Sequence, residues 1–188
     1  MANYEELYYS ARNKYNRAID NRDSSYRRAR DLENQRTNLN NQLSENISQL
    51  NNIREKKSKL QDALNKSREV LNNQYYEMQK AMTDAGGEYR KSFHSDMGTA
   101  DLAEIYRNDF SATKNDLETT ISTLQTAVNN AEQNESQANN SVNNCRNNIY
   151  NVEAQLRTAN SDADAYQRMA NSYYAEMKQY EAKWLNGE

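Results

Sequence analysis

Apolar residues recur along two long stretches of the chain in alternate steps of four and three residues. The first stretch runs from Tyr4 to Ala85 and the second from Phe110 to Trp184. Apolar side chains occupy 17 of the 24 stepped positions in the first stretch and 20 of the 22 in the second. We call these stepped positions the seam. A heptad seam that is kept over so many turns predicts two long α-helices that coil around a partner helix.

The residues that interrupt helices are concentrated between the two seams. Gly86, Gly87 and Gly98 lie there, and the chain contains no proline. Because glycine weakens helices and permits sharp turns, the chain can reverse its direction at this place. We therefore predict an all-α fold, a single elongated hairpin of two antiparallel coiled-coil helices with a glycine-containing tip. Its predicted parts are a helix over residues 3–85, a tip over 86–101 and a helix over 102–185.

In an antiparallel hairpin, paired positions have residue numbers that add up to a constant. With a sum of 188, every seam position from 4 to 78 meets a seam position between 110 and 184. This register places Lys57 and Glu135 in neighbouring layers, close enough for a diagonal ion pair. It also places Arg22 opposite Tyr166, where the guanidinium group can lie over the ring. Polar residues of the seam thus have predicted partners on the opposite helix.

The overall composition is too polar for a thick globular core. Hydrophobic residues make up 36% of the chain and the mean hydropathy is −1.24, which suits a narrow two-helix core. The net charge is −3 and basic residues have acidic neighbours, which argues against nucleic acid or an anionic membrane as a partner. No apolar run has the length of a secretory signal or of a membrane span. We therefore expect no membrane insertion, and either a cytoplasmic location or export by a route that needs no secretory signal peptide.

The sequence contains no motif that predicts catalysis. It has no phosphate-binding glycine loop, no paired-histidine metal motif, and only one histidine, His94. A nucleophilic site also needs a base and a group that orients the base. The single cysteine, Cys145, rules out an internal disulfide and a multi-cysteine zinc site. We predict that the protein is not an enzyme and that it uses no metal, cofactor or small-molecule substrate.

Large apolar side chains also occur outside the seam, mainly near the two ends of the predicted hairpin. Between Asn129 and Asn151, by contrast, ten residues are asparagine. Two interpretations remain open. The off-seam side chains widen the core, or they dock a helical partner or a second copy, for which tyrosine supplies contact area at low entropic cost. The candidate partner-binding residues are Tyr9, Tyr26, Tyr174 and Leu185 at the open end, and Tyr75, Tyr76, Tyr89, Phe93 and Tyr106 near the tip.

The predicted turn carries the sequence Gly86-Gly87-Glu88-Tyr89, followed by Phe93, and a seam flanks it on each side. In these features the chain resembles the helical-hairpin proteins of type VII secretion in Gram-positive bacteria, both the WXG-type substrates and the helical partners of LXG toxins. The Trp-x-Gly motif of that family is absent. The resemblance implies a bacterial, non-catalytic protein that pairs with another helical protein, as a secretion substrate or as the partner or chaperone of a secreted toxin. The alternative function is that of a structural coiled-coil spacer or scaffold.

Overall fold

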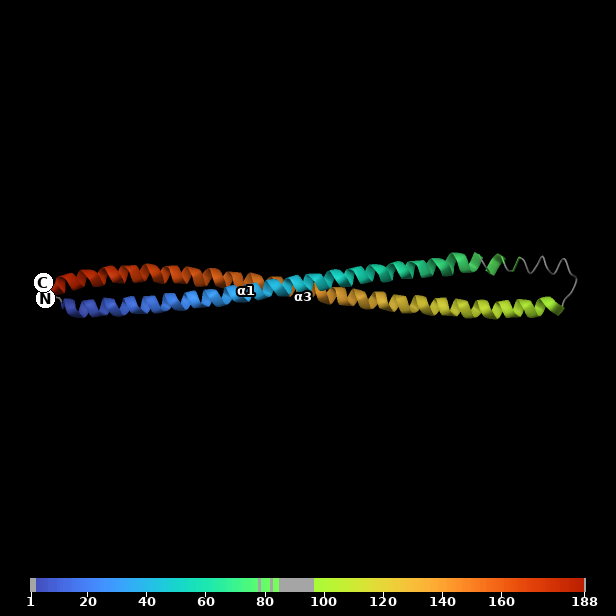
Figure 1. Ribbon diagram of the computed structural model, residues 1–188, viewed down its shortest axis with the longest axis horizontal. Helices are drawn as coiled ribbons and strands as arrows, with labels where there is room; N and C mark the ends of the chain where they lie inside the picture. Colours follow the sequence, from blue (N-terminus) through green and yellow to red (C-terminus); the bar gives the residue numbers. More distant parts are fainter. Residues whose placement is uncertain (1–2, 78, 82, 85–96, 188) are drawn as a thin grey trace. The chain divides into compact units, whose positions relative to one another are not determined.

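A computed structural model describes residues 3–77, 79–81, 83–84 and 97–187, and the side chains of these residues except for 97–110. The chain forms helix α1 (Tyr4–Glu69), a π-helical segment η1 (Val70–Tyr75) and helix α3 (Met97–Leu185) (Figure 1). The described residues between η1 and residue 84 are also helical, and no strand occurs in the described ranges. The predicted all-α fold is confirmed.

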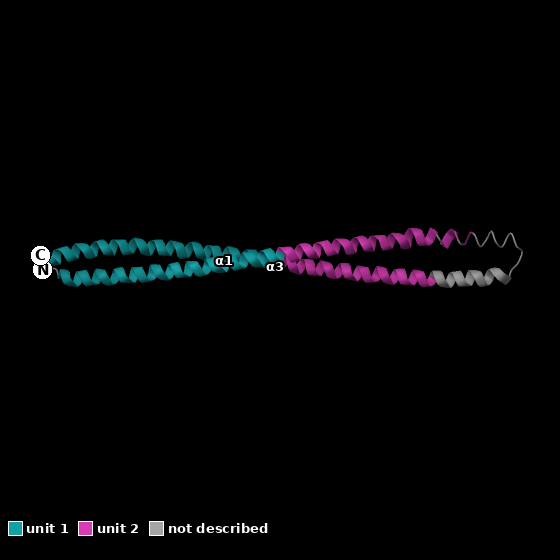
Figure 2. Cartoon of the chain, in the orientation of Figure 1, with its two compact units in different colours: residues 1–46, 141–188 teal, residues 47–140 magenta. Residues whose placement is uncertain are grey.

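The chain divides into two compact units, and each unit contains part of α1 and part of α3 (Figure 2). Unit 1 comprises Met1–Asn46 and Ser141–Glu188, and unit 2 comprises Ile47–Asn140. The two stretches of unit 1 are therefore far apart in the sequence and meet only because the chain reverses its direction.

Contacts between α1 and α3 show that the helices pair in opposite directions. In unit 1 the ring of Tyr4 contacts the ring of Tyr180, and the ring of Tyr15 contacts the ring of Tyr174. In successive contacts, the residue number in α1 thus rises while the residue number in α3 falls. The same relation holds in unit 2, for the hydrogen bonds of Arg54 with Glu135 and of Arg68 with Gln125. The predicted antiparallel hairpin of two helices is confirmed.

The apolar core of each unit follows the predicted seam. Every buried apolar side chain that the structure describes, except that of Tyr75, lies at a seam position. Alanine dominates in unit 1, where small side chains let two helix backbones approach closely, whereas unit 2 buries larger aliphatic groups. The buried seam residues are Ala11, Ala18, Ala29, Leu32, Val142, Cys145, Val152, Ala159, Ala163 and Ala170 in unit 1, and Leu50, Leu64, Val128 and Ala131 in unit 2. In the described part of the chain, no helix is both long and apolar enough to cross a membrane.

Tyr75 marks a correction to the predicted first helix. The sequence predicts an unbroken α-helix over 3–85 with Gln74 in the seam, but Val70–Tyr75 is π-helical. A π turn closes hydrogen bonds from residue i to residue i+5, so it holds more residues than an α turn. The wider turn moves the seam by one position. Tyr75 is consequently buried, with 5% of its surface exposed, while Gln74 is exposed.

Local sequence explains two of the helix ends. At the start of α1, the Asn3 side chain caps the helix, because its Oδ1 accepts a hydrogen bond from the backbone N–H of Glu6 at 3.3 Å. At the other end of the chain, α3 stops at Leu185, as predicted. Gly187 follows with a φ of 70°, and its N–H donates to the carbonyl of Trp184 at 3.2 Å. Glycine adopts this left-handed conformation without a steric penalty, which ends the helix.

The start of α3 differs from the prediction. The helix begins at Met97, so the predicted tip over 86–101 is wrong for residues 97–101. Gly98 lies in the first turn, where backbone N–H groups lack partners within the helix in any case. One glycine in a helix costs only about 1 kcal/mol relative to alanine, and a long helix tolerates that. The predicted tip residues 86–96 lie outside the described residues.

Candidate functional site

Five aromatic residues gather where α1 begins and α3 ends, and we call them the aromatic end: Tyr4, Tyr8, Tyr9, Tyr180 and Trp184. The Tyr8 ring lies 5.3 Å from the Tyr9 ring and 5.9 Å from the Trp184 ring, and Tyr9 lies 6.3 Å from Trp184. Tyr4 and Tyr180 stack at 6.5 Å. These centroid distances are typical of favourable ring pairs. The aromatic end therefore joins the two helices of unit 1 with a preformed cluster of rings.

A further ring pair and three lysines extend this surface along unit 1. Tyr15 of α1 contacts Tyr174 of α3 at 5.8 Å between ring centroids. Each lysine ammonium lies over the face of a ring, which attracts cations. The pairs are Lys14 with Tyr173 at 5.8 Å, Lys178 with Tyr174 at 5.9 Å, and Lys183 with Tyr4 at 5.2 Å. Lys178 also donates a hydrogen bond to Glu181 at 2.7 Å, and this bond raises the pKa of Lys178.

The structure places the four candidates of the open end in unit 1. The rings of Tyr9 and Tyr174 each pack on neighbouring rings, and each of these residues is 46% exposed. Tyr26 is exposed beside a groove that is described below. Leu185 is 77% exposed. Tyr9 and Tyr174 therefore widen the contact between α1 and α3, and all four side chains leave apolar surface in contact with solvent.

The candidates of the predicted tip have different outcomes. Tyr75 is buried and so does not present its ring to a partner, because the π-helical turn rotates it into the seam. Tyr76 is exposed and packs edge-on against Tyr75 at 5.5 Å. Tyr106 lies in α3, but its side chain is outside the described set. Tyr89 and Phe93 lie outside the described residues altogether.

The largest exposed aromatic surface that the sequence analysis missed belongs to Tyr150. This residue is 67% exposed and lies in the asparagine-rich part of α3, where no interaction surface was predicted. A usable signal was its place directly after the seam residue Ile149, which puts Tyr150 outside the seam. Trp184 is also exposed, although it occupies a seam position.

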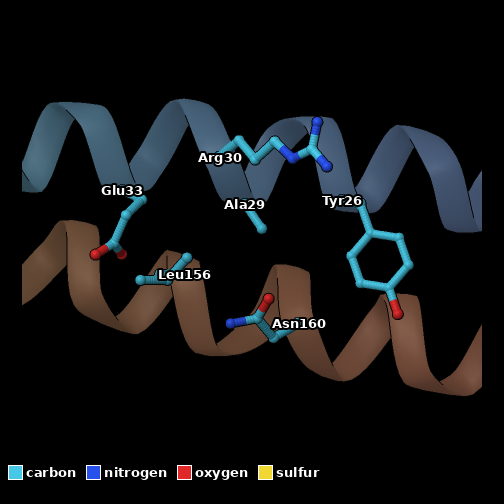
Figure 3. A pocket seen from close by; sticks show the side chains of 6 residues that line it. All are labelled: Tyr26, Ala29, Arg30, Glu33, Leu156 and Asn160. Atoms are coloured by element: carbon cyan, nitrogen blue, oxygen red, sulfur yellow. The ribbon is translucent and has the colours of Figure 1, made fainter.

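A shallow groove of about 260 Å³ lies between α1 and α3 in unit 1 (Figure 3). Figure 3 shows Tyr26 reaching from α1 across to α3, with Ala29 and Leu156 pointing between the helices. Two charged side chains of α1, Arg30 and Glu33, and the amide of Asn160 on α3 complete the lining. The groove thus has an apolar floor and a polar rim. We call it the Tyr26 groove.

The predicted ion pair of unit 2 is confirmed. Lys57 Nζ donates to Glu135 Oε2 at 2.7 Å, and Arg54 Nε donates to Glu135 Oε1 at 2.8 Å. The hydrogen bonds from Lys57 and Arg54 lower the pKa of Glu135, and the bond to Glu135 raises the pKa of Lys57. Both carboxylate oxygens are engaged by cations, so this cluster favours the charged form of Glu135 and connects α3 to α1.

The predicted placement of Arg22 over Tyr166 is wrong. Arg22 Nε and Nη2 donate to Asp23 Oδ1 at 2.9 and 2.7 Å, and Nη1 donates to Gln167 Oε1 at 2.7 Å. Charge-assisted hydrogen bonds of this length are stronger than an exposed contact between a cation and a ring. The guanidinium group therefore connects α1 to α3 through Gln167.

The groups that could carry metal or nucleophilic chemistry are sparse in the described residues. Cys145 is buried, and its Sγ donates to the carbonyl of Leu39 at 3.2 Å. Among the residues that the structure describes, no three His, Cys, Asp or Glu side chains form a group that could hold a metal ion. His94 lies outside those residues.

Comparisons of the chain with protein-family models, with curated proteins and with solved structures found no match. Its function is therefore inferred from the residues of the chain itself.

Proposed function

We propose that the protein is a non-catalytic interaction protein whose aromatic end, together with Leu185, binds a helical partner protein. One observation carries this proposal: Tyr9, Trp184 and Leu185 leave large apolar surfaces exposed next to one another in unit 1. Exposed apolar groups that occur singly are common, but adjacent ones typically mark an interaction surface.

The energetics favour this surface as a binding site. Full burial of a leucine side chain such as that of Leu185 contributes about 1.5–3 kcal/mol. The rings of Tyr8, Tyr9 and Trp184 are already packed against each other, so a partner loses little free energy in ordering them. Tyrosine and tryptophan are also the residues that most often dominate binding energy at protein interfaces.

We further propose that the setting is bacterial type VII secretion, with the protein as a substrate or as the partner or chaperone of a secreted toxin. The antiparallel helical hairpin supports this proposal, as does the resemblance of the sequence around Gly86 and Tyr89 to that family. Pairing with a second helical protein would combine the exposed rings of both proteins into one surface. A spacer or scaffold, in contrast, would not need exposed rings beside Leu185.

A substitution that spares the fold tests the proposal. Leu185→Ser removes the most exposed of the large apolar side chains that the structure describes, and Tyr9→Ser added to it removes a half-exposed ring. The immobilised protein should capture a helical protein from the native host, and the purified partner should then bind the double variant at least about tenfold more weakly, a change of about 1.4 kcal/mol. Circular dichroism should show that both variants keep the parent helicity.

Tyr150→Ser is the matched control, because it removes an equally large and more exposed ring from unit 1 outside the aromatic end. This control should bind the partner as the parent does. Equal binding by the parent and the double variant would show that the aromatic end is not the interface. If Tyr9→Ser unfolds the protein while Leu185→Ser leaves binding intact, the rings serve the core alone, and the spacer function is favoured.

A further inference from the structure

Asn186 differs from every other asparagine of the chain in the residue that follows it. The chain contains 29 asparagines, and only Asn186 is followed by a glycine, Gly187. The backbone nitrogen that follows an asparagine can attack the carboxamide carbon of that asparagine. A side chain on the attacking residue hinders this reaction, and glycine has none. The pair Asn186-Gly187 is therefore the pair in this chain that is best suited to deamidation.

Helical structure protects the other asparagines from the same reaction. Apart from Asn3, every asparagine other than Asn186 lies within a helix. There the following backbone N–H donates to a carbonyl four or five residues earlier, and the helical dihedral angles keep this nitrogen away from the carboxamide carbon. Asn3 uses its side chain to cap α1. Even Asn160 and Asn171, each followed by a small serine, lie inside α3.

Asn186 lies just beyond this protection. Helix α3 ends at Leu185, and Asn186 and Gly187 form an exposed turn after it. The Gly187 N–H donates to the Trp184 carbonyl at 3.2 Å. Apart from its chain neighbours, no described residue has an atom within 4 Å of the place where a β-carbon of Gly187 would be. Because helix ends open easily and nothing packs on this turn, the Gly187 nitrogen can leave Trp184 and reach the Asn186 side chain.

We propose that Asn186 deamidates spontaneously through Gly187, and that this change weakens binding at the adjacent aromatic end. Hydroxide takes the proton of the Gly187 nitrogen, which then bonds to Cγ of Asn186. The Cγ–Nδ2 bond breaks, and ammonia leaves with a proton from water, which restores the hydroxide. The product is a succinimide ring, and water opens it at either carbonyl to give aspartate or isoaspartate. In sum, one water enters, one ammonia leaves, and no group is oxidised or reduced.

Both products alter the end of α3. Each places a negative charge where the last helical turn already presents unpaired carbonyl groups and the negative end of the helix dipole. Isoaspartate also adds a methylene to the backbone before Gly187, so the bond from Gly187 to Trp184 no longer fits. Lys183 lies over the ring of Tyr4 at 5.2 Å and is three residues before Asn186, close enough to pair with the new carboxylate. The charge therefore competes with a contact of the aromatic end.

The effect on binding rests on the proposed function. Leu185 directly precedes Asn186, is 77% exposed, and belongs to the surface that we assign to the partner together with Tyr9 and Trp184. A partner that covers Leu185 would have to remove water from the neighbouring carboxylate, which costs free energy. By the same linkage, a partner that holds the turn closed should slow the deamidation of Asn186.

Peptide mapping by mass spectrometry tests the reaction on the purified full chain in mildly alkaline buffer. Asn186 should convert to a mixture of aspartate and isoaspartate at least about tenfold faster than Asn160 or Asn171, a barrier difference of about 1.4 kcal/mol. The rate should rise with pH, because hydroxide removes the proton. Gly187→Ala should slow the conversion severalfold. Equal rates at the three asparagines would overturn the proposal.

A comparison in concentrated urea tests whether the helix is what protects the other asparagines. Once α3 unfolds, Asn160 and Asn171 should convert faster, and the rate at Asn186 should change less. Unchanged rates at Asn160 and Asn171 would contradict the protection by the helix, and with it the reason for singling out Asn186.

A binding experiment tests the consequence, with the partner captured as described above. Asn186→Asp should bind the partner severalfold more weakly than the parent does. Asn186→Gln keeps a neutral amide, so it should bind like the parent, and it should deamidate more slowly because its ring is larger. The matched control is Asn147→Asp, which adds the same charge at an exposed position of unit 1 outside the aromatic end and should stay within about twofold of the parent affinity. Equal losses for Asn186→Asp and Asn147→Asp would overturn the local effect in favour of net charge.

The two proposals fail separately. If Asn186 stays intact in alkaline buffer, the deamidation site is wrong, whatever the aromatic end binds. If Asn186 deamidates while Leu185→Ser and Asn186→Asp both bind the partner like the parent, the aromatic end is not the interface and the proposed function fails there. If Leu185→Ser weakens binding and Asn186→Asp does not, the interface stands and the effect of deamidation on it is overturned.

Discussion

Units 1 and 2 pair the same two helices with different side chains. In unit 1 the contacts between α1 and α3 include ring pairs such as Tyr15 with Tyr174, and alanines dominate the buried seam. In unit 2 the contacts include hydrogen bonds of Arg54 and Lys57 with Glu135, and Leu50 and Leu64 are buried. The period of the seam therefore determines that the helices pair, and the side chains in and around it determine which contacts hold each unit together.

If the proposed function is right, the difference between the two units affects binding. A ring outside a seam of small residues leaves exposed surface that a partner can cover, as Tyr9 does in unit 1. Polar side chains that reach across a seam form hydrogen bonds with each other, as Lys57 and Glu135 do in unit 2. We therefore expect perturbations of unit 2 to change stability alone, and perturbations of the aromatic end of unit 1 to change binding.

The largest effect should come from shortening a buried side chain of unit 2. Leu64 is 1% exposed, so Leu64→Ala removes its apolar contacts and leaves a cavity. We expect the free energy of unfolding to fall by about 2–5 kcal/mol, as measured by urea unfolding followed by circular dichroism. Leu185→Ser, which truncates an exposed leucine of unit 1, should change it by less than about 0.5 kcal/mol. A small loss for Leu64→Ala would mean that this layer does not support the fold.

A disulfide should stabilise unit 1 by about 2–4 kcal/mol. Cys145 lies against the carbonyl of Leu39, and Leu43 is one helical turn further along α1, in the seam layer that the sum of 188 pairs with Cys145. Leu43→Cys should therefore form an intramolecular disulfide with Cys145 on mild oxidation, detected as a shift in non-reducing electrophoresis. Leu32→Cys, which belongs to another layer of the same unit, should stay reduced. Dimers linked between chains in the Leu43→Cys variant would contradict the register.

Enlarging an alanine of unit 1 tests whether its seam is tightly packed. Ala163 is fully buried, so Ala163→Leu forces extra methyl groups between α1 and α3. We expect a loss of about 1–3 kcal/mol in the same urea experiment. Ala182→Leu places the same groups at an exposed position of α3 and should be close to neutral. Increased stability of Ala163→Leu would show that space remains in the seam of unit 1.

The smallest effect concerns the ion cluster of unit 2 and depends on pH. Because the folded pKa of Glu135 is lowered, its contribution to stability is present above the unfolded carboxyl pKa and is lost as the pH falls through the folded value. The Tm difference between the parent and Glu135→Gln should therefore shrink below about pH 4. The raised pKa of Lys57 predicts a second decline above about pH 10. Glu45→Gln, which removes an exposed carboxylate of unit 1, should show neither change.

Particular residues show how far the sequence determines this structure. The period of the seam predicted the antiparallel hairpin and the pairing of Lys57 with Glu135, because both depend only on the spacing along two helices. The partners of Arg22 were not predicted, since its guanidinium group selects between an opposite ring and the adjacent Asp23 by local geometry. The exposure of Tyr150 was not predicted, because the asparagine-rich composition of residues 129–151 describes the segment as a whole and not this one side chain.

The Tyr26 groove was also beyond the sequence analysis. Tyr26 itself was a candidate, but the groove needs Leu156 and Asn160, which lie more than a hundred residues away in the sequence. Glu33, which lines the groove with Arg30, pairs with Arg36 instead, and Asp23 pairs with Arg22. Counting charges along the chain does not reveal which of them are already neutralised.

The π-helical turn at Val70–Tyr75 gives the chain tolerance to a change in its length. An α-helix that gains one residue must rotate everything beyond it by about 100°, which would turn a seam out of its core. A wider turn can absorb one such insertion locally, and here Tyr75 is buried in place of Gln74. Deleting Asn72, an exposed residue of this turn, should therefore restore α-helical hydrogen bonding while Tyr75 stays buried. During evolution, this turn is therefore a place where one residue can be inserted or deleted while the seam stays packed against α3.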